Sequence, residues 1–146
     1  MNDDELNLNE FLQHYLNIFK IYNAGDYEHE NLVLIAGEDC YLDDYILFQM
    51  EYNPETDLPD YARSHFLTFD SLELKKGDRV RIYTCKGEDH EEIGPRTGKR
   101  YEVVYWNLDA AVWKEHGSEV KLMKYGDSKT VGFDVSVQKW HIDKYN

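Results

Sequence analysis

Apolar and polar residues alternate along most of the chain after residue 28, and groups of turn-forming residues interrupt the alternation at strand-like intervals. A period of two is the pattern of a β-strand with one buried face. Segments that are also rich in β-branched and aromatic residues predict seven strands, at 31–36, 45–52, 65–69, 79–84, 101–106, 119–125 and 129–138. Seven short strands predict a mainly β fold of two packed sheets, a β-sandwich.

The N-terminal segment has a different period. Its apolar residues recur at spacings of three and four, at Leu8, Phe11, Leu12, Tyr15, Leu16 and Phe19. That spacing lines one face of a helix, so we expect a short helix that runs into a first strand near residue 18. Residues 16–22 are also compatible with a strand. The expected organisation is a helical extension over 1–17, a β-sandwich over 18–138 and a tail over 139–146.

Two tight turns and one long loop separate the expected strands. Gly77 and Asp78 mark a turn before the strand at 79–84, and Gly126 and Asp127 mark a hairpin turn before the last strand. Residues 85–100 form the longest irregular stretch, and loops of that length are often functional or mobile.

Two tryptophans bracket a change of direction. Trp106 ends a predicted strand, and Trp113 lies in the short crossover before the strand that carries Val120 and Leu122. A chain that turns in this way passes from one sheet to the other. We therefore expect all four side chains in the core, where each indole removes on the order of 200 Å² from water.

Charge narrows the choice of partners. Residues 1–60 hold fifteen acidic residues and one basic residue, a net charge of -14, whereas residues 61–146 hold fourteen acidic and fifteen basic residues, a net charge of +1. An acidic field of this kind disfavours nucleic acid and anionic lipid and favours basic partners.

Hydropathy and cysteine content predict the compartment. The N-terminus is acidic and the hydrophobic runs are only a few residues long, so we expect a cytoplasmic protein without a membrane segment. Cys40 and Cys85 belong to no metal-binding or redox motif and are expected to be buried free thiols.

The order of several elements resembles a known family. The succession LELKKGDRVRIYTCKG, VYWNLDAAVW and GSEVKLMKYGD is similar to the lamin-tail domain, an immunoglobulin-like β-sandwich of nuclear lamins and of many bacterial proteins. The matching positions are Leu72, Leu74, Gly77, Val80, Ile82, Trp106, Trp113, Gly117, Val120 and Leu122. The chain departs from the family at 114–119, where an Asn-x-Gly-Asp turn is usual. The resemblance covers about residues 18–138 and implies a stand-alone, bacterial-type, non-catalytic interaction module.

Candidate catalytic and metal-binding residues lack suitable partners. Ser64 and His65 are adjacent in an extended segment and should point to opposite faces, which prevents a nucleophile from bonding to its base. His90 lies between carboxylates, but no second histidine follows at i+3 or i+4, as a zinc site would need. We therefore expect no enzyme, no metal and no cofactor, with a hydrolase as a distant alternative.

Two binding functions follow from these patterns. The leading prediction is a module that binds another protein, for which the charge favours a basic one, or that self-associates. It would bind through Asp39, Asp43 and Asp44 or through an exposed strand edge. The alternative is a nucleic-acid-binding sandwich that uses the basic and aromatic segment 75–101. Its basic candidates are Lys75, Lys76, Arg79, Arg81, Arg96, Lys99 and Arg100. Six acidic residues lie within 73–100, so alternating charges on an exposed sheet face explain most of this pattern.

Overall fold

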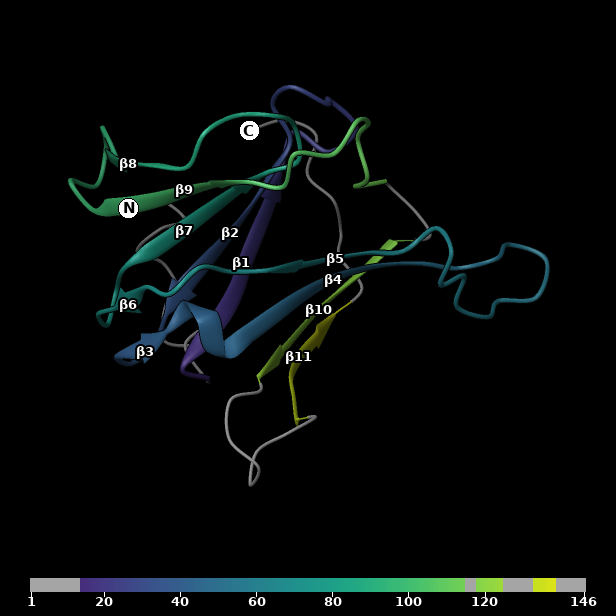
Figure 1. Cartoon of the computed structure of the whole chain (residues 1–146), viewed down its shortest axis with the longest axis horizontal. Helices are drawn as coiled ribbons and strands as arrows, with labels where there is room; N and C mark the ends of the chain where they lie inside the picture. The colour runs from purple at the N-terminus through teal and green to yellow at the C-terminus, as the bar shows by residue number, and fades with distance from the viewer. Residues whose placement is uncertain (1–13, 115–117, 125–132, 139–146) are drawn as a thin grey trace.

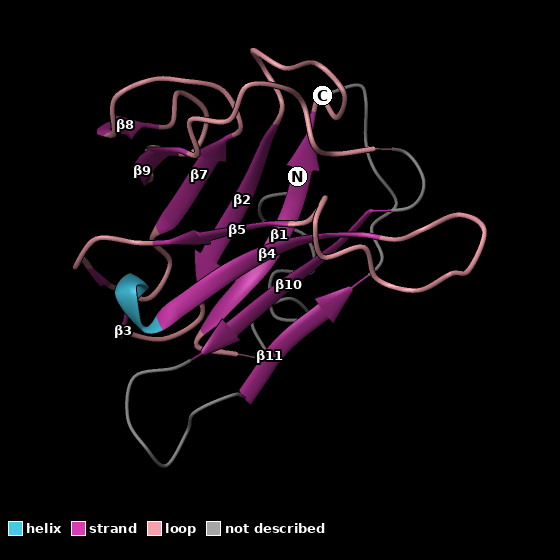
Figure 2. Cartoon of the chain, turned by 45° about the vertical axis from the view of Figure 1, so that its right-hand side comes forward, coloured by secondary structure: helices cyan, strands magenta, loops and turns pink. Residues whose placement is uncertain are grey.

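The structure is a computed structural model that describes residues 14–114, 118–124 and 133–138, with only the backbone of Ser118 and of residues 133–138. Strands dominate these residues (Figures 1 and 2). The longest helical segment among them is a three-residue 3-10 turn, η1 (Leu42–Asp44). The expected mainly β fold is therefore confirmed.

The strands form two larger sheets and one small one. The five-stranded sheet has the order β1 (Leu16–Tyr22), β2 (Asn31–Ala36), β7 (Arg79–Tyr83), β9 (Arg100–Tyr105) and β8 (His90–Ile93). The four-stranded sheet has the order β11 (Phe133–Gln138), β10 (Ser118–Lys124), β4 (Tyr45–Glu51) and β5 (His65–Thr68). The short strands β3 (Cys40–Tyr41) and β6 (Glu73–Leu74) pair with each other. Neighbouring strands are antiparallel except β7 and β9, which are parallel.

The main core takes side chains from both larger sheets, as expected of a β-sandwich. The four residues expected in this core, Trp106, Trp113, Val120 and Leu122, are all buried. The two indole rings lie 6.3 Å apart. Both tryptophans follow β9 in one sheet and precede β10 in the other, which agrees with the predicted crossover.

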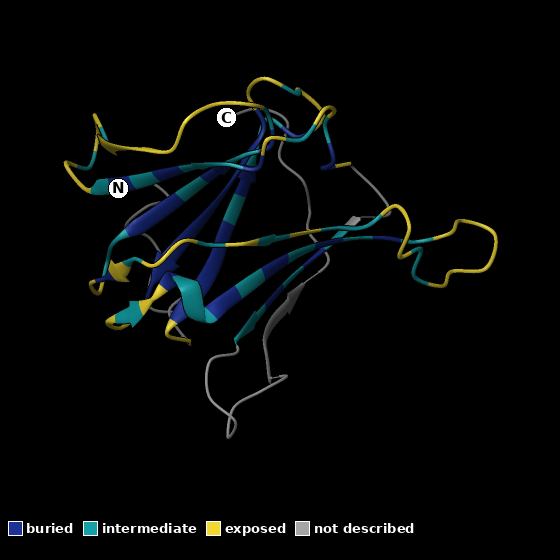
Figure 3. Cartoon of the chain, in the orientation of Figure 1, coloured by how far each residue is buried: buried dark blue, intermediate teal, exposed yellow. Residues whose placement is uncertain are grey.

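A second apolar cluster lies on the opposite face of the five-stranded sheet. It contains Phe19, Val33, Ile35, Tyr101 and Val103. Because the β2 residues between them face the main core, β2 is buried on both faces (Figure 3). A central strand of this kind has a continuous apolar sequence, NLVLIA, instead of strict alternation.

The expected N-terminal helix is wrong for residues 14–17, because residues 14 and 15 form a bend and strand β1 begins at Leu16. The first strand expected near residue 18 is present, and residues 1–13 lie outside the described residues. The pairing of β1 with β2 shifts between Ile18 and Lys20, which marks a β-bulge. Leu16, Ile18 and Ile21 consequently reach the same core at spacings of two and three. The extra residue of the bulge gives the strand an apolar spacing close to that of a helix.

The long segment 85–100 is also more regular than expected. Residues 90–93 form β8, an edge strand that pairs with β9. All four residues of β8 are exposed, so the strand has no apolar alternation in its sequence. The predicted turn at Gly77 is present, with a positive φ of 93°. The predicted turn at Gly126 lies outside the described residues.

Candidate functional site: an acid-rimmed cleft

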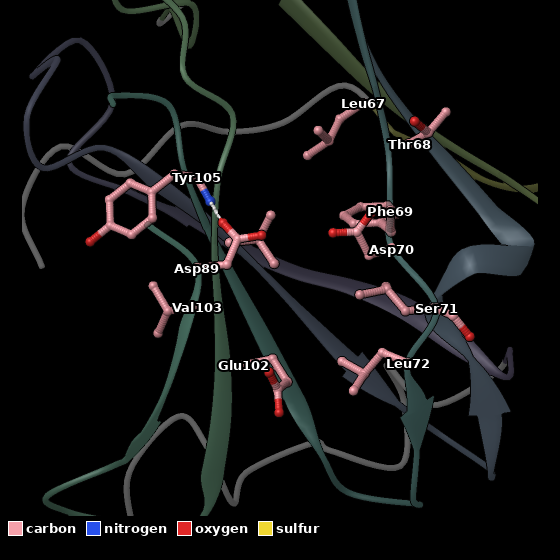
Figure 4. A pocket seen from close by; sticks show the side chains of 12 residues that line it. Leu67, Thr68, Phe69, Asp70, Ser71, Leu72, Asp89, Glu102, Val103 and Tyr105 are labelled. Carbon is pink, nitrogen blue, oxygen red and sulfur yellow. Dashed lines mark hydrogen bonds between the residues drawn. The ribbon is translucent and has the colours of Figure 1, made fainter. Parts of the chain in front are cut away.

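A cleft of about 330 Å³ opens at one side of the molecule, between the β5–β6 segment and strand β9 (Figure 4). Residues 67–72 form one wall, and residues 102–105 form the other. Asp89, from the chain just before β8, completes the rim. The walls meet here because β5 is the edge strand of the four-stranded sheet and β9 lies next to the edge strand of the five-stranded sheet.

The floor of the cleft is apolar. Leu67, Phe69, Leu72 and Val104 are partly buried and pack against the main core. Burial alternates along β5, so that Leu67 is turned inward while its neighbours in the strand are exposed. The cleft is therefore a place where the core of the molecule reaches solvent.

Three carboxylates surround this apolar floor: Asp70, Asp89 and Glu102. Asp70 is exposed on the chain that leaves β5. Asp89 is held in place, because its Oδ1 accepts a hydrogen bond from the backbone amide of Tyr105 at 2.9 Å. Glu102 shares the inner side of β9 with Val104, since side chains two apart in a strand point the same way.

The guanidinium of Arg100 forms ion pairs with three carboxylates near the cleft. Arg100 lies 3.2 Å from Glu102, 3.4 Å from Glu91 and 3.1 Å from Asp78. Three negative charges around one positive charge leave this corner of the molecule acidic. Glu91 is also the residue directly opposite Glu102 in the pairing of β8 with β9. Like charges in that relation repel each other, and Arg100 partly offsets the repulsion.

The pKa of Glu102 reflects this setting. Loss of solvent around its carboxylate raises the pKa, the Arg100 guanidinium opposes that rise, and the nearby Glu91 charge adds to it. A carboxylate whose charged form is destabilised gains free energy from an added cation.

The composition of the cleft limits what it can do chemically. Its lining contains no histidine, cysteine or lysine among the described residues, so Ser71 has no imidazole, thiol or amine beside it. Within the same residues, no group of three or more histidine, cysteine or acidic side chains could hold a metal ion. An apolar floor under a carboxylate rim fits the aliphatic stem and charged end of a lysine or arginine side chain.

The acidic residues that the sequence proposed as a binding face lie elsewhere, around η1. Asp39 accepts a hydrogen bond from the Lys76 amide at 2.9 Å and lies 3.8 Å from the Lys75 ammonium. Asp43 accepts one from the Leu72 amide at 3.2 Å. Asp44 lines a neighbouring hollow of about 280 Å³. Asp39 and Asp43 thus support the local backbone, whichever partner the face has.

The basic residues of the nucleic-acid alternative are mostly engaged within the chain. Lys75 lies 2.7 Å from Glu73, and Lys76 lies 3.9 Å from Glu38. Arg100 lies in the carboxylate group described above. Arg96 and Lys99 are exposed in the connection between β8 and β9.

Arg79 and Arg81 correct the expectation of an exposed basic sheet face. Arg79 is only 3% exposed, and its guanidinium donates to the Tyr101 hydroxyl at 3.1 Å. Arg81 donates to the Asn31 side chain at 2.6 Å and lies 4.9 Å from the centre of the Tyr101 ring. These guanidinium–aromatic contacts hold the arginines in the outer cluster of the sheet.

Ser64 and His65 do not form a catalytic pair. The Ser64 hydroxyl bonds to the backbone of Glu51 and Asp60, whereas His65 bonds to the Gln49 side chain at 3.0 Å. His90 lies 3.0 Å from Glu92, and its hydrogen bond to the Glu88 carbonyl, followed by that to Glu92, raises its pKa.

Cys40 and Cys85 are free thiols, half-buried instead of fully buried as expected. Burial raises the pKa of both and brings that of Cys40 to about 11. A thiol with a raised pKa is protonated and unreactive near neutral pH.

No protein-family model and no curated protein matches this chain. Among the described residues, no helix has the length and apolar character that crossing a membrane requires. We therefore infer the function from the geometry of the sites.

Sequence reasoning missed the cleft. Asp70, Asp89 and Glu102 belong to three separate segments of the chain and share no motif. One signal is visible in the sequence: Glu102 interrupts the apolar run around Tyr101 and Val103. An inward-facing carboxylate on a strand is uncommon, so its position in the sequence indicates a candidate binding site.

Proposed function

We propose that this chain is a non-catalytic protein-interaction module that binds a basic segment of a partner protein in the acid-rimmed cleft. The observation that carries the proposal is the combination of an apolar floor at Leu67, Leu72 and Val104 with carboxylates at Asp70 and Glu102. A lysine or arginine side chain would cover the apolar floor with its methylene groups and bring its charge to the rim.

The net charge of -13 supports the same class of partner. A strongly acidic protein attracts basic proteins over a distance and repels nucleic acid. For the family of the fold, we infer an immunoglobulin-like sandwich of the lamin-tail type. The two packed sheets and the paired tryptophans between β9 and β10 support this inference. Two cysteines without a disulfide between them are compatible with the reducing environment of the cytoplasm, where we place the protein.

Affinity capture with charge variants tests the proposal. Asp70→Lys places a cation at the rim without removing a hydrogen bond of the described residues, and Glu102→Gln removes the charge from the inner wall. We expect both variants to lose the basic proteins that the unaltered chain retains from lysate, as quantified by mass spectrometry. Each variant should keep the far-ultraviolet circular dichroism spectrum of the unaltered chain.

Glu28→Lys is the matched control, because Glu28 is an exposed acid in the β1–β2 connection and does not line the cleft. It changes the net charge by as much as Asp70→Lys. Equal recovery of the same proteins with Asp70→Lys and with Glu28→Lys would show that the cleft is not the binding site.

A further inference from the structure

The connection between β4 and β5 forms an ordered projection, residues 52–64, that we call the finger. It extends away from the two sheets, and most of it is exposed (Figures 1 and 3). The Asn53 side-chain oxygen accepts hydrogen bonds from the amides of Glu55 and Thr56, at 2.8 and 3.4 Å. The Asn53 amide donates to the Leu58 carbonyl at 2.8 Å. These bonds give the tip of the finger a defined conformation.

The base of the finger is fixed to strand β4. The Ser64 hydroxyl accepts from the Glu51 amide at 2.9 Å and donates to the Asp60 carbonyl at 2.9 Å. The Asp60 amide in turn donates to the Glu51 carbonyl at 2.7 Å. A surface built in advance of binding loses little conformational entropy when a partner arrives.

The finger and the adjoining sheet face expose three large apolar side chains. Leu58, Tyr61 and Phe66 are 62%, 76% and 65% exposed. Between the finger and the sheet lies a hollow of about 280 Å³, and its apolar lining is Phe48, Met50, Tyr61, Phe66 and Met123. Aromatic and methionine side chains around a hollow are typical of the energetic centre of a protein interface.

The charges around this surface indicate which partner it fits. The finger carries Glu55, Asp57 and Asp60 against one base, Arg63, which lies 3.4 Å from Asp60. Glu55 and Asp57 are both exposed. A second copy of this chain would bring the same acidic finger and a net charge of -13, so that pairing is electrostatically opposed. A basic partner meets no such repulsion at the finger. Lys121 lines the hollow itself, so the apolar side chains of a basic segment, and not its charges, would enter there.

We propose that the finger and the outer face of β4, β5 and β10 form a docking surface for an amphipathic, basic segment of another protein. Apolar side chains of the segment fill the hollow against Phe66 and Met123. Its lysines or arginines lie over Glu55 and Asp57 at the edge. The occupant is thus a heterologous basic segment and not a second copy.

This surface goes beyond the cleft proposed above, because the two lie on opposite sides of β5. Leu67 is turned toward the cleft, whereas Phe66 is turned outward to the hollow. Variants can therefore remove one surface and leave the other intact.

Fluorescence anisotropy with the full chain tests the proposal. The probe is a labelled amphipathic peptide of leucine and lysine, and its counterpart carries glutamate in place of lysine. We expect the lysine peptide to bind the unaltered chain and the glutamate peptide not to bind. Phe66→Ser and Leu58→Ser remove exposed side chains, so each should weaken binding by about tenfold or more without unfolding the chain. Ile93→Ser, at an equally exposed residue on β8, is the matched control and should bind as the unaltered chain does.

Three results would overturn the proposal. The first is equal affinity for both peptides, and the second is unchanged binding by Phe66→Ser. The third is sedimentation as a dimer that Phe66→Ser converts to a monomer, which would make a second copy the occupant. The second result, combined with loss of peptide binding in Asp70→Lys, would place the peptide in the cleft and leave the proposed function standing.

Discussion

The Glu30 side chain joins three segments that are far apart in the sequence. It is fully buried. Its carboxylate accepts hydrogen bonds from the Gly25 amide at 2.9 Å, the Thr84 hydroxyl at 2.5 Å and the Val112 amide at 2.9 Å. These donors come from the β1–β2 connection, the end of β7 and the crossover between the sheets. A buried carboxylate is tolerated only when its oxygens are satisfied in this way.

Glu30→Gln should destabilise the fold strongly, because the amide group places a donor where the carboxylate accepted. We expect a loss of about 2 to 5 kcal/mol in the free energy of unfolding, from charge-assisted bonds and an unsatisfied buried donor. Urea denaturation measures it. Glu28→Gln, at the exposed neighbour, is the control and should change stability by less than about 0.5 kcal/mol. Equal midpoints for the two variants would show that the buried carboxylate does not hold the crossover.

At the scale of elements, the agreement between sequence and structure depends on which faces a strand buries. The predicted bounds 31–36, 45–52 and 79–84 match β2, β4 and β7 to within one residue at each end. Their apolar content and flanking turns are unambiguous. Strand β8 has exposed residues only, so nothing in HEEI distinguishes it from a loop until β9 pairs with it. Strand β1 is obscured by its bulge.

The environment of Glu102 on β9 predicts how the stability of the fold depends on pH. The pKa of Glu102 is raised in the folded chain, so the folded state holds this proton more strongly than the unfolded state does. Stability from this group is therefore present at low pH and is lost as the pH rises above the unfolded value of about 4.3. The Glu102→Gln variant cannot ionise at this position, so it does not undergo this loss of stability.

The stability of Glu102→Gln relative to the unaltered chain should consequently improve between about pH 4 and pH 7. Thermal unfolding at several pH values measures this difference. Glu73→Gln provides the opposite control, because its bonds to Lys75 and Tyr41 lower the Glu73 pKa and should make that variant comparatively worse as the pH rises. A Glu102→Gln curve parallel to that of the unaltered chain would contradict the assigned environment.

At the scale of the whole molecule, folding redistributes the charge that the sequence divides so unevenly. Glu38 and Asp39 from the acidic part lie beside Lys76 and Lys75 from the other part. Glu30 is withdrawn into the core. The acidic face and basic segment of the sequence are therefore neighbours in space, and each partly neutralises the other. Exposed pairs of this kind add little stability but reduce the local field.

The cleft is a property of the whole molecule, and sequence patterns could not reveal it for that reason. Periodicity predicts the sheets, and the tryptophan spacing predicts the crossover between them. The cleft arises only where the edge of one sheet lies across from the other sheet, bringing Asp70 and Glu102 to the same opening. Such a relation depends on how the sheets are stacked, and no local pattern encodes it.

The most direct test of the central claim is a nuclear magnetic resonance titration of the isotopically labelled chain with a short peptide of lysine and glycine, which lacks the apolar side chains that the finger requires. The same peptide with every lysine acetylated keeps the stems and loses the charge. Binding in the cleft predicts saturable shifts at the amides of residues 67–72 and 102–105 with the first peptide, and shifts at least several-fold weaker with the second. The absence of shifts at those amides, or equal shifts with both peptides, would contradict binding of a basic side chain in the cleft.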